Sequence, residues 1–505
     1  MSELPWLTIL ILVPLVGALV TAFLPSGPGE PLAKQVGLGF SVATLVPAGV
    51  LLGGFDLDGG FQFTEQHEWI SLLGAHYALG LDGLGLVMVL LTVVLVPLVM
   101  LASWRDSDEG STRAFFGWVL ALEALSLAVF TATDVFLFYV VFEATLIPAY
   151  FLIAGFGRAG RSRAATKFLI YQLAGGLVML ASVIGLYVVS ADAGSPSYLI
   201  GDLAALDIDE TTQRWLFVGF FIAFAIKAPL FPVHTWLADT TEKATTGTSV
   251  LLVCVLDKIG TFGMLRFCLG LLPDASQWAT PVVVVLALIS IVYGALVAIG
   301  QDDVLRLIGL TSLSHFGLIV LGIFVFSSQG ASGAILYMVN HGLATAALFL
   351  VAGFMIRRSG TPLISQMGGL EKVAPVLAGT FLVAGLASLG LPGLSPFVSE
   401  MLVIIAAFGY AWWAGAVAVT AIVLAAIYIL WTYQRTMTGP VRPEFSGVKD
   451  LDVREVGTVA PLLLALVLFG FAPMPLLDVI NPNVEDTLTY VGVTDDPPTV
   501  GAISD

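Results

Sequence analysis

Charged residues are scarce in this chain of 505 residues. Only 11% are Asp, Glu, Lys or Arg, whereas soluble domains carry about a quarter. Hydrophobic side chains make up 58% and the mean hydropathy is +0.97, which excludes an ordinary soluble domain. The apolar runs extend over about twenty residues without alternating, so a transmembrane β-barrel is excluded as well. The sequence therefore predicts an all-α polytopic membrane protein.

Cysteine and nucleotide-binding motifs are also scarce or missing. The two cysteines, Cys254 and Cys268, lie in one apolar stretch without a CxxC pair or a Cys/His cluster, so we expect no metal site. The sequence has no GxxxxGK[ST] loop and no GxGxxG after a strand, so we expect no nucleotide or other cofactor on this chain. The net charge of −16 comes mostly from acids in loops and argues against a nucleic-acid partner.

Apolar segments long enough to cross a bilayer predict about fourteen membrane-spanning helices. They cover residues 6–24, 36–53, 81–103, 115–131, 135–156, 168–189, 215–238, 249–271, 282–299, 305–326, 331–356, 375–408, 412–433 and 458–471. We group them into an N-terminal three-helix segment (1–110), a first five-helix repeat (111–275), a second five-helix repeat (276–440), and a last helix with an exposed tail (441–505).

The basic residues predict the orientation, because loops kept in the cytoplasm hold an excess of Lys and Arg. Sixteen of the twenty basic residues fall in loops that follow odd-numbered spans. Arg214 and Arg266 lie toward the other side, and Lys227 and Lys258 fall inside spans. An even number of spans then places both termini on the non-cytoplasmic side of the membrane.

Two spans are interrupted by prolines next to a charge. Pro229 and Pro232 follow Lys227, and Pro392 and Pro396 precede Glu400. The broken spans are five apart, an odd number, so the second repeat would enter the membrane from the opposite side, as in inverted-repeat transporters. Ordinary proline kinks are the alternative interpretation.

Several ionisable side chains fall inside the predicted spans, where each costs at least about 2.5–3.5 kcal/mol to insert. Such groups usually face a protein interior or water and mark a pathway. The principal candidates are Glu143, Lys227, Lys258 and Glu400, and the supporting candidates are His234, His315, His341 and Glu123.

Each candidate also has a structural interpretation. Glu143 and Lys227 would then form a static buried ion pair, Glu123 would be a bond between helices, and the histidines would be satisfied donors. Asp257 points about 100° away from Lys258 on a helix, so we expect it to be the less buried of the two.

Outside the spans, we expect His67 and His76 to be loop residues. Asp82, at the start of the third span, is expected to be an acid at a helix N-terminus.

The types of residue favour proton transfer. Desolvation lowers the proton affinity of a buried lysine, and a nearby carboxylate raises it. Moving or hydrating that carboxylate therefore changes whether the lysine holds its proton. A proton could then cross in steps through lysines, histidines and water. A sodium pathway would want several oxygen ligands at one site, and central lysines argue against it.

Five stretches resemble the proton-pumping, antiporter-like membrane subunits of respiratory complex I and of multisubunit cation/proton antiporters. They are VVFEATLIPAYFLIAGFG with AATKFLIYQLAGG after it, FAIKAPLFPVHTWLAD, LDKIGTFGMLRF, DVLRLIGLTSLSHFG and GLPGLSPFVSE, and they lie within spans three to thirteen. A glutamate at position 400, where sister subunits usually carry lysine, is similar to the M-type branch of this family.

The resemblance implies roles for the candidate residues. Glu143 and Lys227 would be the coupling ion pair, Lys258 the central lysine and Glu400 the terminal exchange site. His341 and His315 would be intermediates, and His234 would match a histidine of the broken helix.

The resemblance also implies a translocase subunit within a large assembly, alongside other membrane-arm subunits. NADH, FMN, iron–sulfur clusters and quinone would be bound by partner subunits, whose redox chemistry would drive translocation here. Two alternatives stay open: a subunit of a multisubunit sodium/proton antiporter, and a scaffold that only holds its partners.

Overall fold

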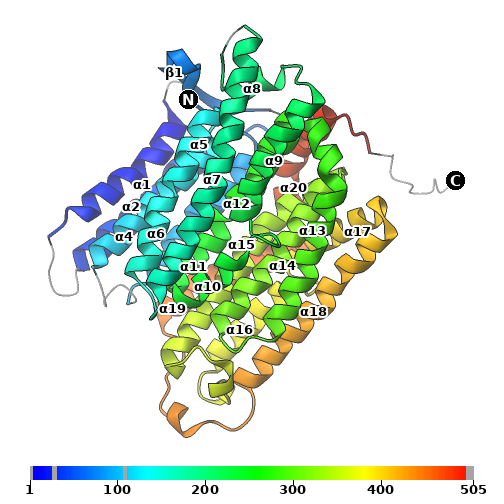
Figure 1. Ribbon diagram of the computed structural model, residues 1–505. Helices are drawn as coiled ribbons and strands as arrows, with labels where there is room; N and C mark the ends of the chain where they lie inside the picture. Colours follow the sequence, from blue (N-terminus) through cyan, green and yellow to red (C-terminus); the bar gives the residue numbers. More distant parts are fainter. Residues whose placement is uncertain (1–3, 26–30, 58, 106–110, 195, 496–505) are drawn as a thin grey trace, which may run out of the picture.

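A computed structural model describes residues 4–25, 31–57, 59–105, 111–194 and 196–495 as a bundle of long helices (Figure 1). Eleven helices among these residues are long and apolar enough to cross a membrane by length and composition, and three shorter ones are also apolar. The predicted helical membrane protein is therefore confirmed, although these numbers do not fix the count of spans at fourteen.

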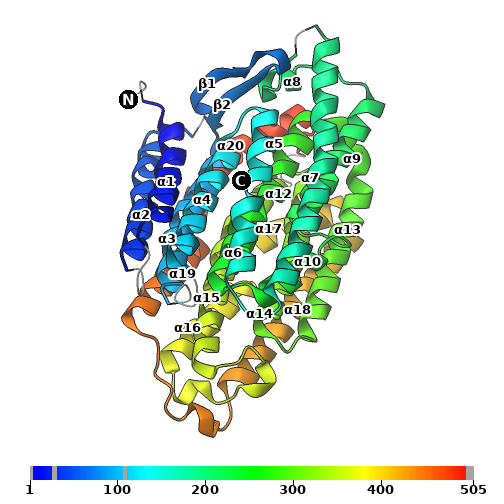
Figure 2. The same cartoon turned by 60° about the vertical axis from the view of Figure 1, so that its left-hand side comes forward.

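The helices that carry the first part of the chain begin with α1 and α2, which lie side by side at one edge of the bundle (Figure 2). In chain order the helices are α1 (Trp6–Ala22), α2 (Pro31–Gly53), α3 (Gly83–Ala102), α4 (Thr112–Thr131), α5 (Val135–Ala144), α6 (Leu146–Gly155), α7 (Arg161–Asp192), α8 (Ile200–Ala204), α9 (Glu210–Lys227) and α10 (Thr235–Lys243).

The second part begins with one helix that alternates between α and π geometry: α11 (Thr246–Leu251), η3 (Leu252–Leu256), α12 (Lys258–Gly263) and η4 (Met264–Leu269). The remaining helices are α13 (Pro273–Ile299), α14 (Val304–Phe324), α15 (Ser328–Ser359), α16 (Pro375–Ser388), α17 (Ser395–Tyr410), α18 (Trp412–Met437), α19 (Val453–Phe471) and α20 (Met474–Val491). Short 3-10 turns are η1 (Ser71–Leu73), η5 (Ile364–Gln366), η6 (Leu370–Lys372) and η7 (Pro443–Phe445).

An antiparallel hairpin interrupts the otherwise helical fold. Strands β1 (Gln62–Ile70) and β2 (Ala75–Leu81) pair between α2 and α3 and lie with α8 at one end of the bundle (Figure 2). His67 and His76, expected in a loop, lie on these strands. A search for apolar runs misses the hairpin because β1 is largely exposed and polar.

Both predicted helix breaks are present. The first lies between Lys227, the last residue of α9, and Thr235, the first of α10, and the second separates α16 from α17. At the first break the indole Nε1 of Trp236 donates to the carbonyl of Ile226 at 3.0 Å, which partly satisfies backbone freed by the prolines. The matched breaks are consistent with the inverted repeats at 111–275 and 276–440, which stay a prediction.

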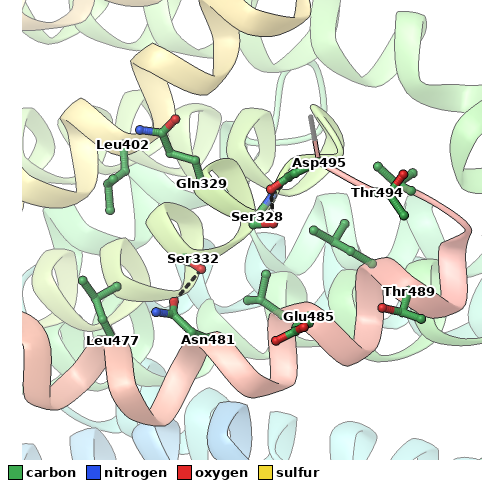
Figure 3. Close-up of a pocket in the computed structure, with 13 residues that line it drawn as sticks. Ser328, Gln329, Ser332, Leu402, Leu477, Asn481, Glu485, Thr489, Thr494 and Asp495 are labelled. Atoms are coloured by element: carbon green, nitrogen blue, oxygen red, sulfur yellow. Dashed lines mark hydrogen bonds between the residues drawn. The ribbon is translucent and has the colours of Figure 1, made fainter. Parts of the chain in front are cut away.

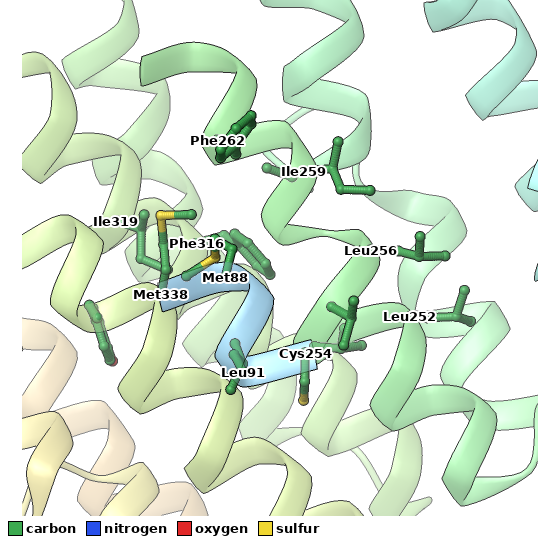
Figure 4. Close-up of a cluster of buried hydrophobic side chains, with 14 of the residues drawn as sticks. Met88, Leu91, Leu252, Cys254, Leu256, Ile259, Phe262, Phe316, Ile319 and Met338 are labelled. Atoms are coloured by element: carbon green, nitrogen blue, oxygen red, sulfur yellow. The ribbon is translucent and has the colours of Figure 1, made fainter. Parts of the chain in front are cut away.

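The core lies where α14 and α15 meet the helix of α11 to η4, since the apolar windows of all three are buried throughout. Figure 4 shows side chains of α3, α12, α14 and α15 packed together there, among them Met88, Ile259, Phe316 and Met338. Apolar packing of this kind leaves little room for water around any charged group placed inside it.

Part of the expected exposed tail is instead the helix α20. Its buried residues, Ile480, Val484 and Leu488, recur every four positions and pack the helix against α3 and α15. The span search missed α20 because only one face is apolar. Residues 496–505 lie outside the described part of the chain.

A pocket of about 580 Å³ lies between α20, α17 and the start of α15 (Figure 3). On its wall the hydroxyl of Ser332 donates to Asn481 Oδ1 at 2.8 Å, and Asp495 accepts from Ser328. These contacts tie the residues after α20 to the N-terminus of α15.

Asp82 is an N-cap, as predicted, and also a partner of Arg266. Its Oδ1 accepts from the amide of Gly85 at 2.9 Å, and its two oxygens lie 2.7 and 2.6 Å from the guanidinium of Arg266 on η4. Asn483 of α20 donates to the same carboxylate at 2.6 Å. One buried carboxylate thus joins α3, η4 and α20.

Replacing Arg266 by alanine should leave this buried carboxylate uncompensated. We expect Arg266→Ala to lower the free energy of unfolding by about 3 kcal/mol, measured by thermal unfolding of the detergent-purified protein. The control is Arg214→Ala, whose exposed pair with Glu210 spans 2.9 Å and contributes less than about 1 kcal/mol. Equal effects of the two changes would contradict this account.

Candidate functional site

Lys227 is placed by the first helix break. It is buried at the end of α9, where its Nζ donates to the hydroxyl of Thr145 at 3.3 Å and lies 4.7 Å from the centre of the Phe142 ring. Phe142 and Thr145 belong to the α5–α6 joint, which also carries Glu143. The break thus brings a buried ammonium group to the region of the predicted glutamate.

Glu143 is half-buried and packs against α7. A Cβ built on Gly176 would lie 1.8 Å from its Oε1, so only glycine leaves room for the carboxylate there. No direct ion pair between Glu143 and Lys227 occurs among the described residues, although the two groups interact electrostatically. The geometry is that of two nearby charges rather than a locked salt bridge.

Lys258 and two histidines form a connected cluster in the core. Nζ of Lys258 lies 2.6 Å from Nδ1 of His341 and 4.3 Å from the centre of the Phe316 ring. The rings of His341 and His315 are 5.2 Å apart between centroids. Nε2 of His341 and Nδ1 of His315 are buried and have no hydrogen-bond partner among the described residues.

Two tyrosines extend this cluster to Glu400. The hydroxyl of Tyr428 lies 3.3 Å from Nε2 of His315, and the hydroxyl of Tyr337 donates to Oε1 of Glu400 at 2.5 Å. The Tyr337 ring is 5.9 Å from that of His315. Lys258, His341, His315 and Glu400 therefore lie near one another among buried polar side chains, and their role as a relay stays a prediction.

The second helix break makes room for Glu400. Gly390 adopts a φ of +74°, and a Cβ there would lie 2.0 Å from Oε2 of Glu400. Asn340, one residue before His341, donates to the carbonyl of Ser395 at 2.8 Å and so fixes the start of α17 to α15. The break therefore positions the carboxylate as well as interrupting the helix.

His234 and Glu123 have their neighbours elsewhere. His234 precedes α10, and its ring stacks near Phe231 and Tyr293 at 5.9 and 5.2 Å. Glu123, on α4, is buried, faces Ser41 of α2 and has no hydrogen bond of good geometry among the described residues. Within the described part of the chain, neither residue forms a hydrogen bond, an ion pair or a ring contact with the Lys258 cluster.

Sequence reasoning missed two members of the site, namely Tyr337 and Tyr428. Tyr337 precedes His341 by four residues and so shares its helix face, a spacing that could have revealed it. Asp257 is 1% exposed and Lys258 0%, so the expectation that Asp257 is the less buried of the two gains no support. Helix α9 packs against α12 and α15 packs against η3, so both residues are buried.

An ion-pair network lies beyond the predicted span 215–238. Asp239 accepts from Lys167 and from Arg306, each at 2.6 Å. Glu242 accepts from Arg306 at 2.8 Å and pairs with Lys243 at 2.6 Å. These residues border a pocket of about 760 Å³.

The network perturbs both carboxyl groups. Partial burial acts to raise the pKa of Asp239, but hydrogen bonds and charges from Lys167 and Arg306 outweigh it and hold the pKa below its ordinary value of 3.8. Burial also opposes ionisation of Glu242, yet Lys243 and Arg306 keep its pKa below 4.5. Both groups are therefore carboxylates at neutral pH.

Within the described residues, no group of three or more His, Cys, Asp or Glu side chains is placed to hold a metal ion. Cys254 and Cys268 are buried and not bridged to each other. The groups that the structure brings together are lysine, histidine, tyrosine and carboxyl side chains, all of which exchange protons.

Adding a methyl group at Gly390 should displace Glu400. We expect Gly390→Ala to break the Tyr337–Glu400 hydrogen bond and to lower the free energy of unfolding by about 1–2 kcal/mol, because a left-handed backbone is unfavourable for alanine. A map of the variant and its thermal unfolding measure the two effects. The control is Gly379→Ala on α16, where a Cβ meets nothing within 4 Å; an unmoved Glu400 in the Gly390 variant would disprove the packing argument.

Removing Arg306 should shift the acid stability of the network. Carboxyl groups with a lowered pKa stabilise the folded state above their unfolded pKa, and this stability is lost as the pH falls through the folded pKa. In Arg306→Gln both pKa values rise toward 3.8 and 4.5, so we expect the variant to be less stable at neutral pH and to lose less further stability on acidification than the unmodified protein. Thermal unfolding against pH measures this, with Arg163→Gln in the same pocket as the control; superimposable profiles would refute it.

The family described as "NADH:quinone oxidoreductase/Mrp antiporter, TM" matches residues 132–425, which include Lys227, Lys258 and Glu400. NADH-quinone oxidoreductase subunit M of Mycobacterium tuberculosis is 49% identical over 99% of this chain and 97% of the relative.

Two solved structures have the same fold. A chain of "Respiratory complex I from Thermus thermophilus with bound NADH" superimposes with a TM-score of 0.88 and is 33% identical, over 96% of this chain and all of that one. A chain of the Mrp complex from Dietzia sp. superimposes with a TM-score of 0.85 over 97% of this chain and 99% of that one, but its 22% identity shows a shared fold alone.

The helix breaks after α9 and between α16 and α17 thus occur in a chain that a relative matches over 99% of its length. This chain belongs to the NADH:quinone oxidoreductase/Mrp antiporter transmembrane family.

Proposed function

We propose that this chain is a proton-translocating subunit of the membrane arm of an NADH–quinone oxidoreductase. The observation that carries the proposal is the group of neighbouring buried proton-exchanging side chains that extends from Lys258 past His341 and His315 to Glu400. Ionisable groups inside a membrane protein generally mark a pathway. The 49% identity with a subunit M supports the assignment to this complex.

The contacts support transfer in steps. An ammonium group on Lys258 can give a proton to Nδ1 of His341 at 2.6 Å. Nε2 of His341 and Nδ1 of His315 are buried without a partner among the described residues and their rings lie 5.2 Å apart between centroids, so a single bridging water in this otherwise dry packing would suffice to pass the proton on. Tyr337 then connects this interior to the carboxylate of Glu400. Each step moves one proton and leaves the donor ready to be recharged.

Lys227 and Glu143 would control entry to this series. Their charges interact without locking together, so a movement of Glu143 changes the proton affinity of Lys227 at little cost in broken bonds. This is the behaviour of a switch, whereas a bidentate salt bridge would hold both groups fixed.

The driving force would come from partner subunits of the assembly. They would bind NADH, FMN, iron–sulfur clusters and quinone, while this chain carries no redox site. The chain would lie in the bacterial inner membrane with both termini on the non-cytoplasmic side. The sixteen basic residues of the alternate loops support this orientation.

The alternative is a subunit of a multisubunit sodium/proton antiporter. The shared fold with the Mrp complex chain favours it, but lysines at the centre of the pathway are poor surroundings for a sodium ion. Transport in vesicles with and without sodium separates the two functions: dependence on sodium supports the antiporter, and dependence on NADH alone supports the oxidoreductase.

Removing Lys227 should block translocation without dissolving the assembly. We expect Lys227→Ala to lower NADH-driven proton pumping by about a hundredfold, because a positioned proton-transfer group contributes on that order. Glu143→Gln should have the same direction of effect. Pumping is measured by a pH-sensitive dye in membrane vesicles, and assembly by native gel electrophoresis.

The control is Lys372→Ala, which removes an exposed lysine outside the spans and should leave pumping unchanged. Full pumping by the assembled Lys227→Ala complex would refute the proposed relay. If replacing Lys227, Lys258 and Glu400 together by uncharged residues leaves proton pumping unchanged, the chain is instead a scaffold.

A further inference from the structure

Asp257 is a buried carboxyl group to which the proposed relay gives no role. It lies at the junction of η3 and α12, is 1% exposed, and its Oδ2 has no hydrogen-bond partner among the described residues. A buried polar atom without a partner is costly, and a buried unpaired charge is more so. Such a group calls for an explanation.

The packing of α12 shows which way Asp257 faces. Three residues further on, a Cβ on Gly260 would lie 2.4 Å from the amide nitrogen of Ala228, and one on Gly263 would lie 2.4 Å from the Phe224 ring. These glycines therefore press α12 against the end of α9. Residues three apart share a helix face, so Asp257 faces the same end of α9, where Lys227 is the last residue.

Lys258 projects from the same helical turn in another direction. Its Nζ reaches His341 of α15, about 100° around the helix axis from its neighbour. One turn of backbone thus presents a carboxyl group toward Lys227 and an amine toward the histidines.

Both lysines attract Asp257. The charges of Lys227 and Lys258 both act on the carboxyl group of Asp257. Among the described residues, Lys227 contacts a hydroxyl and Lys258 an imidazole, and neither forms an ion pair with an acid. Asp257 is therefore a negative charge common to both.

We propose that Asp257 is an additional proton-binding residue of the relay, which receives a proton from Lys227 and delivers it to Lys258. This inference rests on the proposed function. In the first step an ammonium group on Lys227 becomes an amine as the carboxylate of Asp257 becomes a carboxyl group. In the second, that carboxyl group returns to a carboxylate as the amine of Lys258 becomes an ammonium group.

The competing explanation is a permanent counter-charge, a carboxylate that neutralises the lysines and never takes up a proton. The two explanations differ in protonation: a relay residue is protonated during turnover, and a permanent counter-charge is not. Substitution and infrared spectroscopy together distinguish them.

The test uses the whole assembly in membrane vesicles, with Asp257→Asn, which keeps the size but cannot exchange a proton, and Asp257→Glu, which can. We expect Asp257→Asn to slow NADH-driven pumping by about a hundredfold and Asp257→Glu to retain most of it. Asp207→Asn, an exposed acid outside the spans, is the matched control and should pump normally.

Infrared difference spectra with and without NADH give the second measurement. A carbonyl-stretching band from a protonated carboxyl group should appear on energisation, disappear in Asp257→Asn and shift in Asp257→Glu. If Asp257→Asn does not assemble, the shift in the glutamate variant still decides the question.

Normal pumping by Asp257→Asn, or spectra in which no carboxyl band responds to position 257, would overturn the inference. The outcome is separable from that of the proposed function. If Lys227→Ala does not pump protons while Asp257→Asn pumps normally, only the role of Asp257 is contradicted. If Lys227→Ala pumps normally, the relay itself is contradicted.

Discussion

The contact between Lys258 and His341 places an amine 2.6 Å from an imidazole nitrogen inside an apolar helix bundle. Phe316 covers the amine on one side at 4.3 Å, and apolar side chains of α3, α12, α14 and α15 pack together in the same core (Figure 4). In such surroundings a charge is stabilised mainly by the groups that it touches, because water is excluded. The positions of the histidines, the tyrosines and the carboxyl groups follow from this constraint.

The irregular segments of the backbone lie beside the same buried ionisable groups. Each helix break provides space that a regular helix would fill, and a glycine lies where a carboxylate needs it: Gly176 beneath Glu143 and Gly390 beneath Glu400. Between the breaks, the π-helical turns on both sides of α12 lie around Asp257 and Lys258. Backbone irregularity inside a membrane is tolerated where it is buried in protein, and here it is found beside the ionisable groups.

The two ends of the bundle are stabilised differently. One end carries the hairpin, α8 and α20, and there the buried pair of Asp82 and Arg266 joins α20 to α3 and η4. The other carries the partly exposed network around Arg306, Asp239 and Glu242. A buried pair cannot lose one partner without a large penalty, whereas a partly exposed network can exchange partners with water. The second end is thus the one where charged groups can rearrange at low cost.

The sequence by itself determined the membrane helices, the two broken helices and most of the buried ionisable residues. Long apolar runs, prolines and charges at bilayer depth have strong local effects that depend little on what packs against them. Only the tertiary structure decided which of those residues meet: it joined Lys258 to His341, brought in Tyr337 and Tyr428, turned Asp257 toward α9 and left Glu123 beside α2. It also revealed the hairpin and α20. These elements are only partly buried, so they have no long apolar run in the sequence. Contacts between helices far apart in the chain depend on how their faces pack, and a single sequence does not specify that packing residue by residue.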